Sequence, residues 1–326
     1  MSQDITILGG GVAGLAMASE FLAKGAGVTV IDPAGRPGEH ACSWWAGGML
    51  AAECEGALAE EPVVRQGRKA AQWWADQGVE ITHNGTLIVA SGRDQSELMT
   101  FARRVPAAQW LDAAQIADLE PHLAEQFTRA LFVEREGHMN PRPALTSLYD
   151  RLAASGVQFV TKGASRGQVI DCRGLAARSD LDGLRGVKGE MVIVRTPDVQ
   201  LARPVRLLHP RFPLYIVPRG DGVFMLGATQ IESGERTRAT VRSVMELLNA
   251  AYALHPAFGE AELLEIGVDA RPAFSDNQPR IRRIGDRIYA NGLFRHGYLL
   301  APALARMTAL MVIEGTEPED WYEDYR

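Results

Sequence analysis

Hydrophobic residues near the start of the chain follow two patterns in turn. The apolar run 5–8 predicts a buried strand, and residues 12–24 have the length and composition of a helix. A second apolar run, 28–31, predicts another strand and ends at Asp32. Strand, helix and strand in this order predict a parallel βαβ unit at the start of the chain.

The same patterns predict the remaining elements. Helices are expected at 62–77, 141–154, 240–255 and 303–314. Strands are expected at 85–90, 157–160, 169–172, 189–195, 213–218, 223–228 and 287–291. Asn140 and Pro141 are suited to the N-cap and first position of the second of these helices, and Gly220-Asp221-Gly222 is typical of a hairpin turn. The ends of the chain are therefore α/β in character and the middle is antiparallel, which predicts two interleaved domains.

Between the first strand and helix lies the glycine pattern Gly9-x-Gly11-x-x-Gly14. Gly9 allows a tight turn, Gly11 lets a pyrophosphate approach the backbone, and Gly14 lets helix and strand pack closely. The positive end of a helix starting near Val12 would face the phosphates. Asp32 can accept hydrogen bonds from ribose hydroxyls and would repel a 2′-phosphate. The alternative is a glycine-rich turn without a ligand.

Composition narrows the class of protein. The chain has 326 residues, of which 46% are hydrophobic and 23% charged, and this is typical of a soluble enzyme of one or two domains. A net charge of −6 with scattered arginines argues against a nucleic-acid partner. Cys42, Cys54 and Cys172 have no disulfide or metal-ligand spacing, so we expect reduced thiols in a cytoplasm and no metal.

No segment predicts a leader or a membrane span. Asp4 precedes the first apolar run without a Lys or Arg, so the N-terminus does not have the pattern of a signal peptide. The long apolar stretch 297–315 contains Pro302 and Arg306, so we expect a buried helix there.

Four further segments would not be needed by a simple nicotinamide dehydrogenase. Small residues in 41–50 would let the backbone lie against a flat group, and 291–302 is a strand, a glycine loop and a helix. Two short motifs lie between them, Tyr215-Ile-Val-Pro-Arg219 and Val268-Asp-Ala-Arg-Pro272. Together these segments resemble the D-amino-acid oxidase superfamily of FAD-dependent amine oxidases, and most of all the glycine oxidases of bacterial thiamine biosynthesis.

The resemblance covers almost the whole chain and implies a fold. It implies an α/β protein in which a Rossmann-like FAD-binding domain is interleaved with an α+β substrate domain built on an antiparallel sheet. The FAD-binding domain is expected to contain residues 1–60, 138–188 and 266–326. The substrate domain is expected to contain residues 61–137 and 189–265.

The resemblance also implies roles for particular residues. The FAD pyrophosphate would be held by Gly9, Gly11, Val12, Ala13 and Gly14, and the ribose by Asp32 and Pro33. The flavin would be lined by Cys42, Ser43, Gly47, Gly48, Met49, Leu293, Phe294, Arg295, His296, Gly297, Tyr298 and Leu299. Arg271 would clamp the substrate carboxylate with the help of Tyr215, because a guanidinium offers it a planar fork. Met49, Gln230 and Arg295 would complete the substrate site, although Arg295 could equally be structural.

These features predict a cytoplasmic FAD-dependent oxidase of a small amino acid, glycine first. The products would be an imine or glyoxylate and hydrogen peroxide, with oxygen as electron acceptor, and the imine could feed thiazole synthesis. A relative acting on sarcosine, proline-like or D-amino acids is the alternative, and a flavin-binding module without catalysis is a rival of another class. We expect no nucleic acid and no membrane as partner, and a homo-oligomer is left open.

Three departures from the family pattern concern substrate choice and cofactor contacts. Trp44 and Trp45 replace small residues in the flavin loop, and Gln230 replaces a methionine. Only about a dozen residues separate the helix ending near Ala154 from the strand at 169–172, so adenine contacts cannot be placed near 157–168. His138 is expected to be a packing residue rather than a base.

Overall fold

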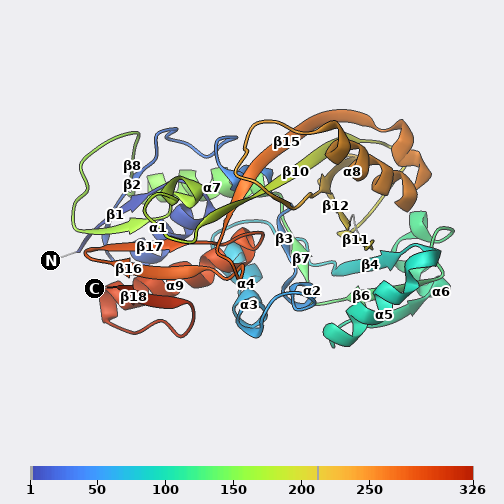
Figure 1. Ribbon diagram of the computed structural model, residues 1–326, viewed down its shortest axis with the longest axis horizontal. Helices are drawn as coiled ribbons and strands as arrows, with labels where there is room; N and C mark the ends of the chain where they lie inside the picture. Colours follow the sequence, from blue (N-terminus) through green and yellow to red (C-terminus); the bar gives the residue numbers. More distant parts are fainter. Residues whose placement is uncertain (1–2, 211–212, 326) are drawn as a thin grey trace.

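The structure is a computed structural model, and it describes residues 3–210 and 213–325. Within these residues the strands form two large sheets and one short pair. Figure 1 shows the large sheets at opposite ends of the molecule, joined along one side by the long strands β10 (Arg185–Arg195) and β15 (Glu262–Ala273). The fold is the α/β arrangement of two interleaved parts that the sequence predicted.

The first sheet contains the N-terminal βαβ unit. Its strand order is β18-β16-β17-β9-β1-β2-β8, and β8, β2, β1, β9 and β17 run parallel. The strands are β1 (Asp4–Leu8), β2 (Gly27–Ile31), β8 (Gln158–Val160), β9 (Gln168–Asp171), β16 (Arg280–Ile284), β17 (Arg287–Asn291) and β18 (Tyr322–Tyr325). The helices of this part are α1 (Val12–Ala23), α7 (Pro141–Ala154) and α9 (Gly297–Glu314), and their apolar residues share one core with β1 and β2.

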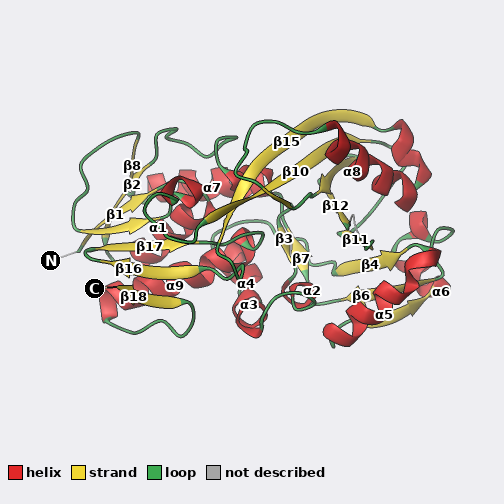
Figure 2. Cartoon of the chain, in the orientation of Figure 1, coloured by secondary structure: helices red, strands yellow, loops and turns green. Residues whose placement is uncertain are grey.

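The second sheet has the order β14-β10-β13-β12-β11-β4-β6-β5, with β15 on the other edge of β10. Its other strands are β4 (Thr86–Ala90), β5 (Gln109–Asp112), β6 (Arg129–Val133), β11 (Val205–Leu208), β12 (Leu214–Pro218), β13 (Val223–Gly227) and β14 (Ile231–Glu232). It is antiparallel apart from the parallel pair β4–β11. Helices α5 (Gln95–Arg104), α6 (Ala113–Leu119) and α8 (Val241–Leu254) accompany it at the far end of the molecule (Figure 2).

Short elements connect the two parts. They are η1 (Cys42–Trp45), β3 (Met49–Leu50), α2 (Ala52–Glu55), α3 (Glu61–Gly67), α4 (Ala70–Asp76) and β7 (Gly137–His138), and β3 pairs with β7. Val63, Ala70 and Trp74 from α3 and α4 pack in the core of the first sheet. The predicted boundary at residue 61 would assign these two helices to the substrate domain, although their buried side chains pack in the core of the first sheet.

Most of the predicted elements agree with the structure. Asn140 caps α7 by accepting from the Arg142 N–H, and Gly220 to Gly222 form the turn between β12 and β13. The helix expected at 62–77 is wrong as a single element. Gly67, at the break between α3 and α4, lies so close to Leu299 that a Cβ there would be 2.8 Å from its Cγ.

The C-terminal helix starts at Gly297, and the expected start at Ala303 is wrong. Proline normally disrupts a helix because it has no N–H to donate to the carbonyl four residues earlier. Here that carbonyl belongs to Tyr298, and it accepts the indole N–H of Trp74 at 2.8 Å. A tertiary contact thus supplies the hydrogen bond that Pro302 cannot make, and the helix extends through it.

Helix α9 is, among the described residues, the one helix long and apolar enough to cross a membrane. However, 67% of that stretch is buried inside the protein, as expected for a core helix. The sequence patterns did not predict β15, because its first half is mostly exposed and its apolar and polar residues do not alternate regularly.

Candidate active site

The glycine loop after β1 has the geometry that its sequence predicted. Gly9 has a φ of 98°, and a Cβ there would lie 2.7 Å from the carbonyl oxygen of Cys172. A Cβ on Gly14 would lie 1.8 Å from the carbonyl oxygen of Gly9. Helix α1 begins after Gly11 without a side-chain cap, so N–H groups of its first turn remain available to a ligand. The Val12 N–H donates a long hydrogen bond of 3.4 Å to Ser43 Oγ.

The acid at the end of β2 is held in place by backbone donors. Asp32 Oδ2 accepts from the Gly10 N–H at 2.6 Å, and Oδ1 accepts from the Ala34 N–H at 2.9 Å. His40 approaches Oδ1 at 3.6 Å. The side chain is 14% exposed and lines a cavity, which leaves lone pairs free for hydroxyl groups.

One cavity of about 1410 Å³ extends from this loop to the second sheet. Ordinary small-molecule sites measure roughly 300–1,000 Å³, so this cavity has room for a dinucleotide and a substrate. Every residue to which the resemblance gave a cofactor or substrate role lines it except Gly14, which packs behind the loop. The lining residues are Gly9, Gly11, Val12, Ala13, Asp32, Pro33, Cys42, Ser43, Gly47, Gly48, Met49, Tyr215, Gln230, Arg271, Leu293, Phe294, Arg295, His296, Gly297, Tyr298 and Leu299.

The half-buried Arg219 holds the flavin-loop segment 42–49 through hydrogen bonds to backbone carbonyls. Arg219 donates to the carbonyl oxygens of Ala46 at 3.2 Å, Gly47 at 2.9 Å and Met139 at 2.9 Å. Burial lowers the pKa of Arg219 to about 10, so it stays protonated at neutral pH. A Cβ on Gly48 would lie 2.2 Å from the Met139 carbonyl oxygen, so the loop lies directly against its support.

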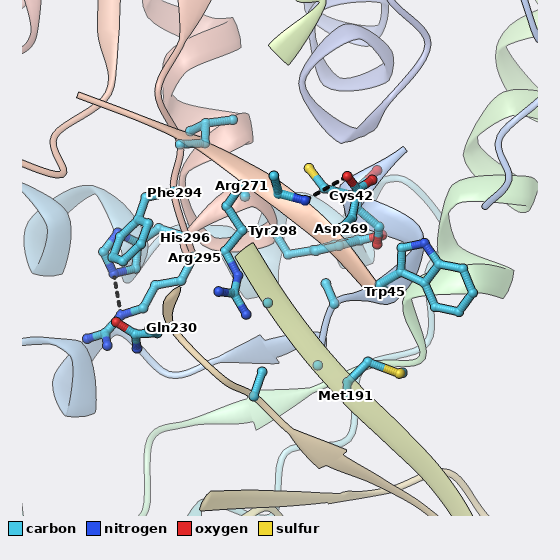
Figure 3. Close-up of a pocket in the computed structure, with 18 of the residues that line it drawn as sticks. Cys42, Trp45, Met191, Gln230, Asp269, Arg271, Phe294, Arg295, His296 and Tyr298 are labelled. Carbon is cyan, nitrogen blue, oxygen red and sulfur yellow. Dashed lines mark hydrogen bonds between the residues drawn. The ribbon is translucent and has the colours of Figure 1, made fainter. Parts of the chain in front are cut away.

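Arg271 from β15 and Tyr215 from β12 both line the cavity where the second sheet forms its wall. Arg271 Nη1 donates to the Thr229 carbonyl at 3.1 Å, and no carboxylate of the described residues lies within 4 Å of its guanidinium. In Figure 3, Arg271 lies between the loop of Phe294 to His296 and the strand that carries Met191. A cation without a carboxylate partner, facing a cavity, is suited to bind an anionic ligand.

Arg295 has a different environment. Its Nη2 forms a 2.7 Å ion pair with Glu55, which also accepts from Arg206 at 2.8 Å and contacts His296 Nε2 at 2.9 Å. Burial alone would raise the pKa of Glu55, but the charges of Arg295 and Arg206 outweigh burial and hold this pKa well below its usual range. Of the two readings of Arg295, the structure favours the structural one, because its guanidinium already has an ion-pair partner.

Several residues of this wall were missed by the sequence reasoning. Glu55 lies at the end of α2, just after the flavin-loop segment, and had no assigned role. Arg206 comes from β11 and had no local signal. Asp269 is buried and paired with Arg236 at 2.6 Å, and together with burial it raises the pKa of the Cys42 thiol to about 12. Only the tertiary fold brings these residues together.

The two tryptophans of the flavin loop have separate positions. Trp45 lines the cavity, and its ring lies over Gly267, where a Cβ would be 2.2 Å from Trp45 Cε3. Trp44 packs against the core of the first sheet and does not line the cavity. Gln230 lines the cavity and is exposed to it.

The shortened segment that left adenine contacts unplaced forms β8 and a loop. None of residues 157–168, all of them described, lines the cavity. The neighbouring wall is formed by Cys172, Arg173, Gly174, Leu175 and Ala176, which follow β9. This segment lies beside Gly9 and is the candidate adenosine side of the cavity.

A glycine loop at the carboxyl end of a parallel strand, an acid at the end of the next strand and a dinucleotide-sized cavity against a second sheet define a dinucleotide-binding oxidoreductase. The chain belongs to the family of FAD dependent oxidoreductases, whose pattern matches residues 4–311. The uncapped start of α1, the fixed Asp32 and the cavity volume fit FAD.

Two relatives in sequence are close over most of their length. A protein of Rhizobium etli that carries the name thiamine biosynthesis oxidoreductase ThiO is 49% identical, covering 97% of this chain and 98% of its own. The glycine oxidase of Geobacillus kaustophilus is 28% identical, covering 97% and 93%.

Two solved structures share the fold. The crystal structure of glycine oxidase from Geobacillus kaustophilus has a TM-score of 0.81 at 24% identity, covering 98% of this chain and 96% of that one. Iminodiacetate oxidase from Chelativorans sp. has a TM-score of 0.82 at 21% identity, covering 98% and 99%. At these identities the likeness concerns the fold alone.

Proposed function

We propose that this enzyme oxidises the amine of a small amino acid, glycine first, in a FAD-dependent reaction. The observation that carries the proposal is Arg271, an arginine without a carboxylate partner that lines the same cavity as Tyr215 and the flavin loop. The names of the two relatives, a thiamine biosynthesis ThiO and a glycine oxidase, support the same chemistry.

In this proposal Arg271 binds the substrate carboxylate with its planar fork. Tyr215 contributes a hydroxyl to the same carboxylate. Met49, Gln230 and Arg295 complete the substrate site, with Arg295 held by Glu55. Fixing the carboxylate orients the Cα–H bond toward the flavin, and such orientation is worth several kcal/mol in enzymes, on the order of 7–11 at best.

The cofactor would be held by residues from both ends of the chain. Gly9, Gly11, Val12 and Ala13 would hold the pyrophosphate, with Asp32 and Pro33 at the ribose. The segments Cys42 to Met49 and Leu293 to Leu299 would line the flavin. When bound, FAD supplies a two-electron acceptor that takes a hydride and passes both electrons to oxygen, giving hydrogen peroxide.

The balance of the reaction is simple. The neutral amine loses the Cα–H as a hydride and becomes an iminium ion, and the iminium ion then releases one N–H proton to water, which leaves the imino acid. A neutral amine needs no general base for this step. Water then gives glyoxylate and ammonia, or the imine is used in thiazole formation. A cytoplasmic location and oxygen as acceptor belong to this proposal, and a homo-oligomer is left open.

The alternative is a relative acting on sarcosine, proline-like or D-amino acids. Gln230 is the observation that bears on it, because an apolar substituent facing a desolvated amide would leave its groups unpaired, at about 1–3 kcal/mol. We also propose the division into a FAD-binding domain and a substrate domain as predicted from the sequence, with α3 and α4 packed against the former.

The test is anaerobic mixing of the purified flavoprotein with glycine, sarcosine, D-alanine or D-proline. Loss of the visible flavin bands with glycine supports the proposal, and faster bleaching by D-proline favours the alternative. Flavin bands that none of these amines bleaches would contradict both.

A further inference from the structure

The guanidinium of Arg271 rests on the backbone of the neighbouring strand. In the β10–β15 ladder Arg271 pairs with Val187, and Gly189 pairs with Asp269. Because side chains alternate along a strand, these four residues project on one face of the ribbon. The Arg271 side chain runs along this face until its guanidinium covers Gly189.

The space above Gly189 is filled by Arg271. A Cβ on Gly189 would lie 2.2 Å from Nη2, 2.5 Å from Cζ and 2.7 Å from Nη1 of Arg271, and these are its three nearest atoms. Gly189 lies in regular ladder geometry and is not among the residues with positive φ. The backbone conformation at 189 therefore does not require glycine, but the guanidinium of Arg271 occupies the space that a side chain at 189 would fill.

We propose that Gly189 is a positioning residue, whose missing side chain lets Arg271 present its fork to the substrate carboxylate. The Thr229 carbonyl is the other support, at 3.1 Å from Nη1. Thr229 is itself tied to the strand, because Glu190 N–H donates to Thr229 Oγ1 at 2.9 Å and Thr229 N–H donates to the Glu190 carbonyl at 3.2 Å. The Arg271 guanidinium is therefore held by two contacts, one with the backbone at Gly189 and one with the Thr229 carbonyl.

The second proposed carboxylate ligand has a similar support. Tyr215 pairs with Gly227 across β12 and β13, and a Cβ on Gly227 would lie 2.7 Å from Tyr215 Cε2. On its other side a Cβ on Gly47 would lie 3.0 Å from the same carbon. Both side chains that would hold the carboxylate therefore lie on strand glycines.

The inference rests on the proposed role of Arg271. Alanine at 189 would push away the end of a flexible side chain and leave the backbone in place. A displacement of about 1 Å can cost roughly a hundredfold in catalytic efficiency. For Gly189→Ala we expect the KM for glycine to rise at least about tenfold, with less change in kcat and with full FAD content.

A double-mutant cycle tests this inference. Gly189→Ala, Arg271→Ala and the double variant are compared for kcat/KM with glycine and for acetate binding, followed by perturbation of the flavin spectrum. If Gly189 acts through Arg271, adding Gly189→Ala to Arg271→Ala changes neither quantity further. Gly92→Ala is the matched control, because a Cβ there meets nothing within 4 Å.

Each other outcome has a definite meaning. A wild-type KM in Gly189→Ala, or an equal loss in the Arg271→Ala background, would overturn the inference. If Gly189→Ala does not fold but the double variant does, the clash with Arg271 is supported; if neither folds, the inference is wrong. If Arg271→Ala itself keeps full activity, the proposed carboxylate site fails instead.

Discussion

At the scale of single residues, the cavity arginines differ in whether they already form an ion pair with a carboxylate. Arg295 and Arg206 share Glu55, and Arg236 pairs with Asp269. Arg271 has only a carbonyl oxygen as partner. A carboxylate ligand therefore gains more at Arg271 than at Arg295, Arg206 or Arg236, because it need not displace an existing ion pair.

We expect Arg271→Ala to lose most activity while FAD stays bound. A charge-assisted pair lost from a desolvated site costs on the order of 2–5 kcal/mol. That corresponds to a roughly thirtyfold to several-thousandfold loss in kcat/KM. Arg271→Lys should also be poor, since an ammonium lacks the planar fork. Steady-state kinetics with flavin quantification measure this, and an active Arg271→Ala enzyme would place the clamp elsewhere.

The two tryptophans of the flavin loop should behave differently on substitution. Trp45 lines the cavity and Trp44 does not, so Trp45→Ala should raise kcat/KM for D-proline relative to glycine, by roughly tenfold. Trp44→Ala is the matched control and should leave this ratio unchanged. The prediction fails if the two variants have the same selectivity as wild type.

At the scale of elements, long-range contacts decide where helices and short strands can form. Helix α9 continues through Pro302 because the Trp74 indole satisfies the Tyr298 carbonyl. The strand pair β3–β7 places Met49 opposite His138 at the base of the flavin loop. Both features combine residues more than eighty positions apart in the chain.

Trp74→Phe should destabilise the protein by about 1–3 kcal/mol, because it removes the donor and leaves a buried carbonyl unpaired. Urea unfolding monitored by far-UV circular dichroism measures this change. Trp73→Phe is the control, since its indole donates to Glu20 at a partly buried site where water can replace it. Equal effects of the two substitutions would contradict this account of α9.

His138 should make stability depend on pH. Burial, followed by the charge of Arg219, lowers its pKa to about 4 from a usual value of 6.5. Between these values the unfolded chain binds the proton and the folded protein does not, so stability falls as pH falls from about 6.5 to 4. The loss is at most about 3 kcal/mol. Unfolding free energies of wild type and His138→Gln across this window should converge at low pH, and parallel curves would refute the assignment.

At the scale of the whole molecule, the cavity lies between residues from the start, middle and end of the chain. Strands β10 and β15 connect the second sheet, which carries Arg271 and Tyr215, with the first sheet and its glycine loop (Figure 1). The site therefore depends on how the two interleaved parts are joined.

The size of the cavity and the fixed Asp32 predict FAD rather than FMN, because FMN would leave the pyrophosphate loop and the ribose acid without partners. The protein should purify yellow. Heat release followed by chromatographic identification of the flavin tests this, and recovery of FMN would exclude the assignment of the Gly9 to Gly14 loop.

The sequence by itself determined the local chemistry of this protein. Apolar patterns and cap residues placed α1, α7, α8 and β17 within a few residues. Gly9, Gly11, Gly14 and Asp32 could be read directly, since a phosphate loop is made by consecutive backbone groups. Arg271 and Tyr215 were found through resemblance, and their functional roles stay predictions.

Tertiary structure decided the features that depend on partners distant in the chain. No local pattern shows that Glu55 forms ion pairs with Arg206 and Arg295. Nor does any local pattern show that the Trp74 indole replaces the donor missing at Pro302. The same holds for the contact of the Arg271 guanidinium with Gly189. Ion pairs and close contacts form across strands and helices whose order in space the periodicity does not specify. The chain encodes its cofactor loop in consecutive residues, but the proposed substrate site depends on residues of β10, β12 and β15, which only the tertiary fold brings to the same cavity.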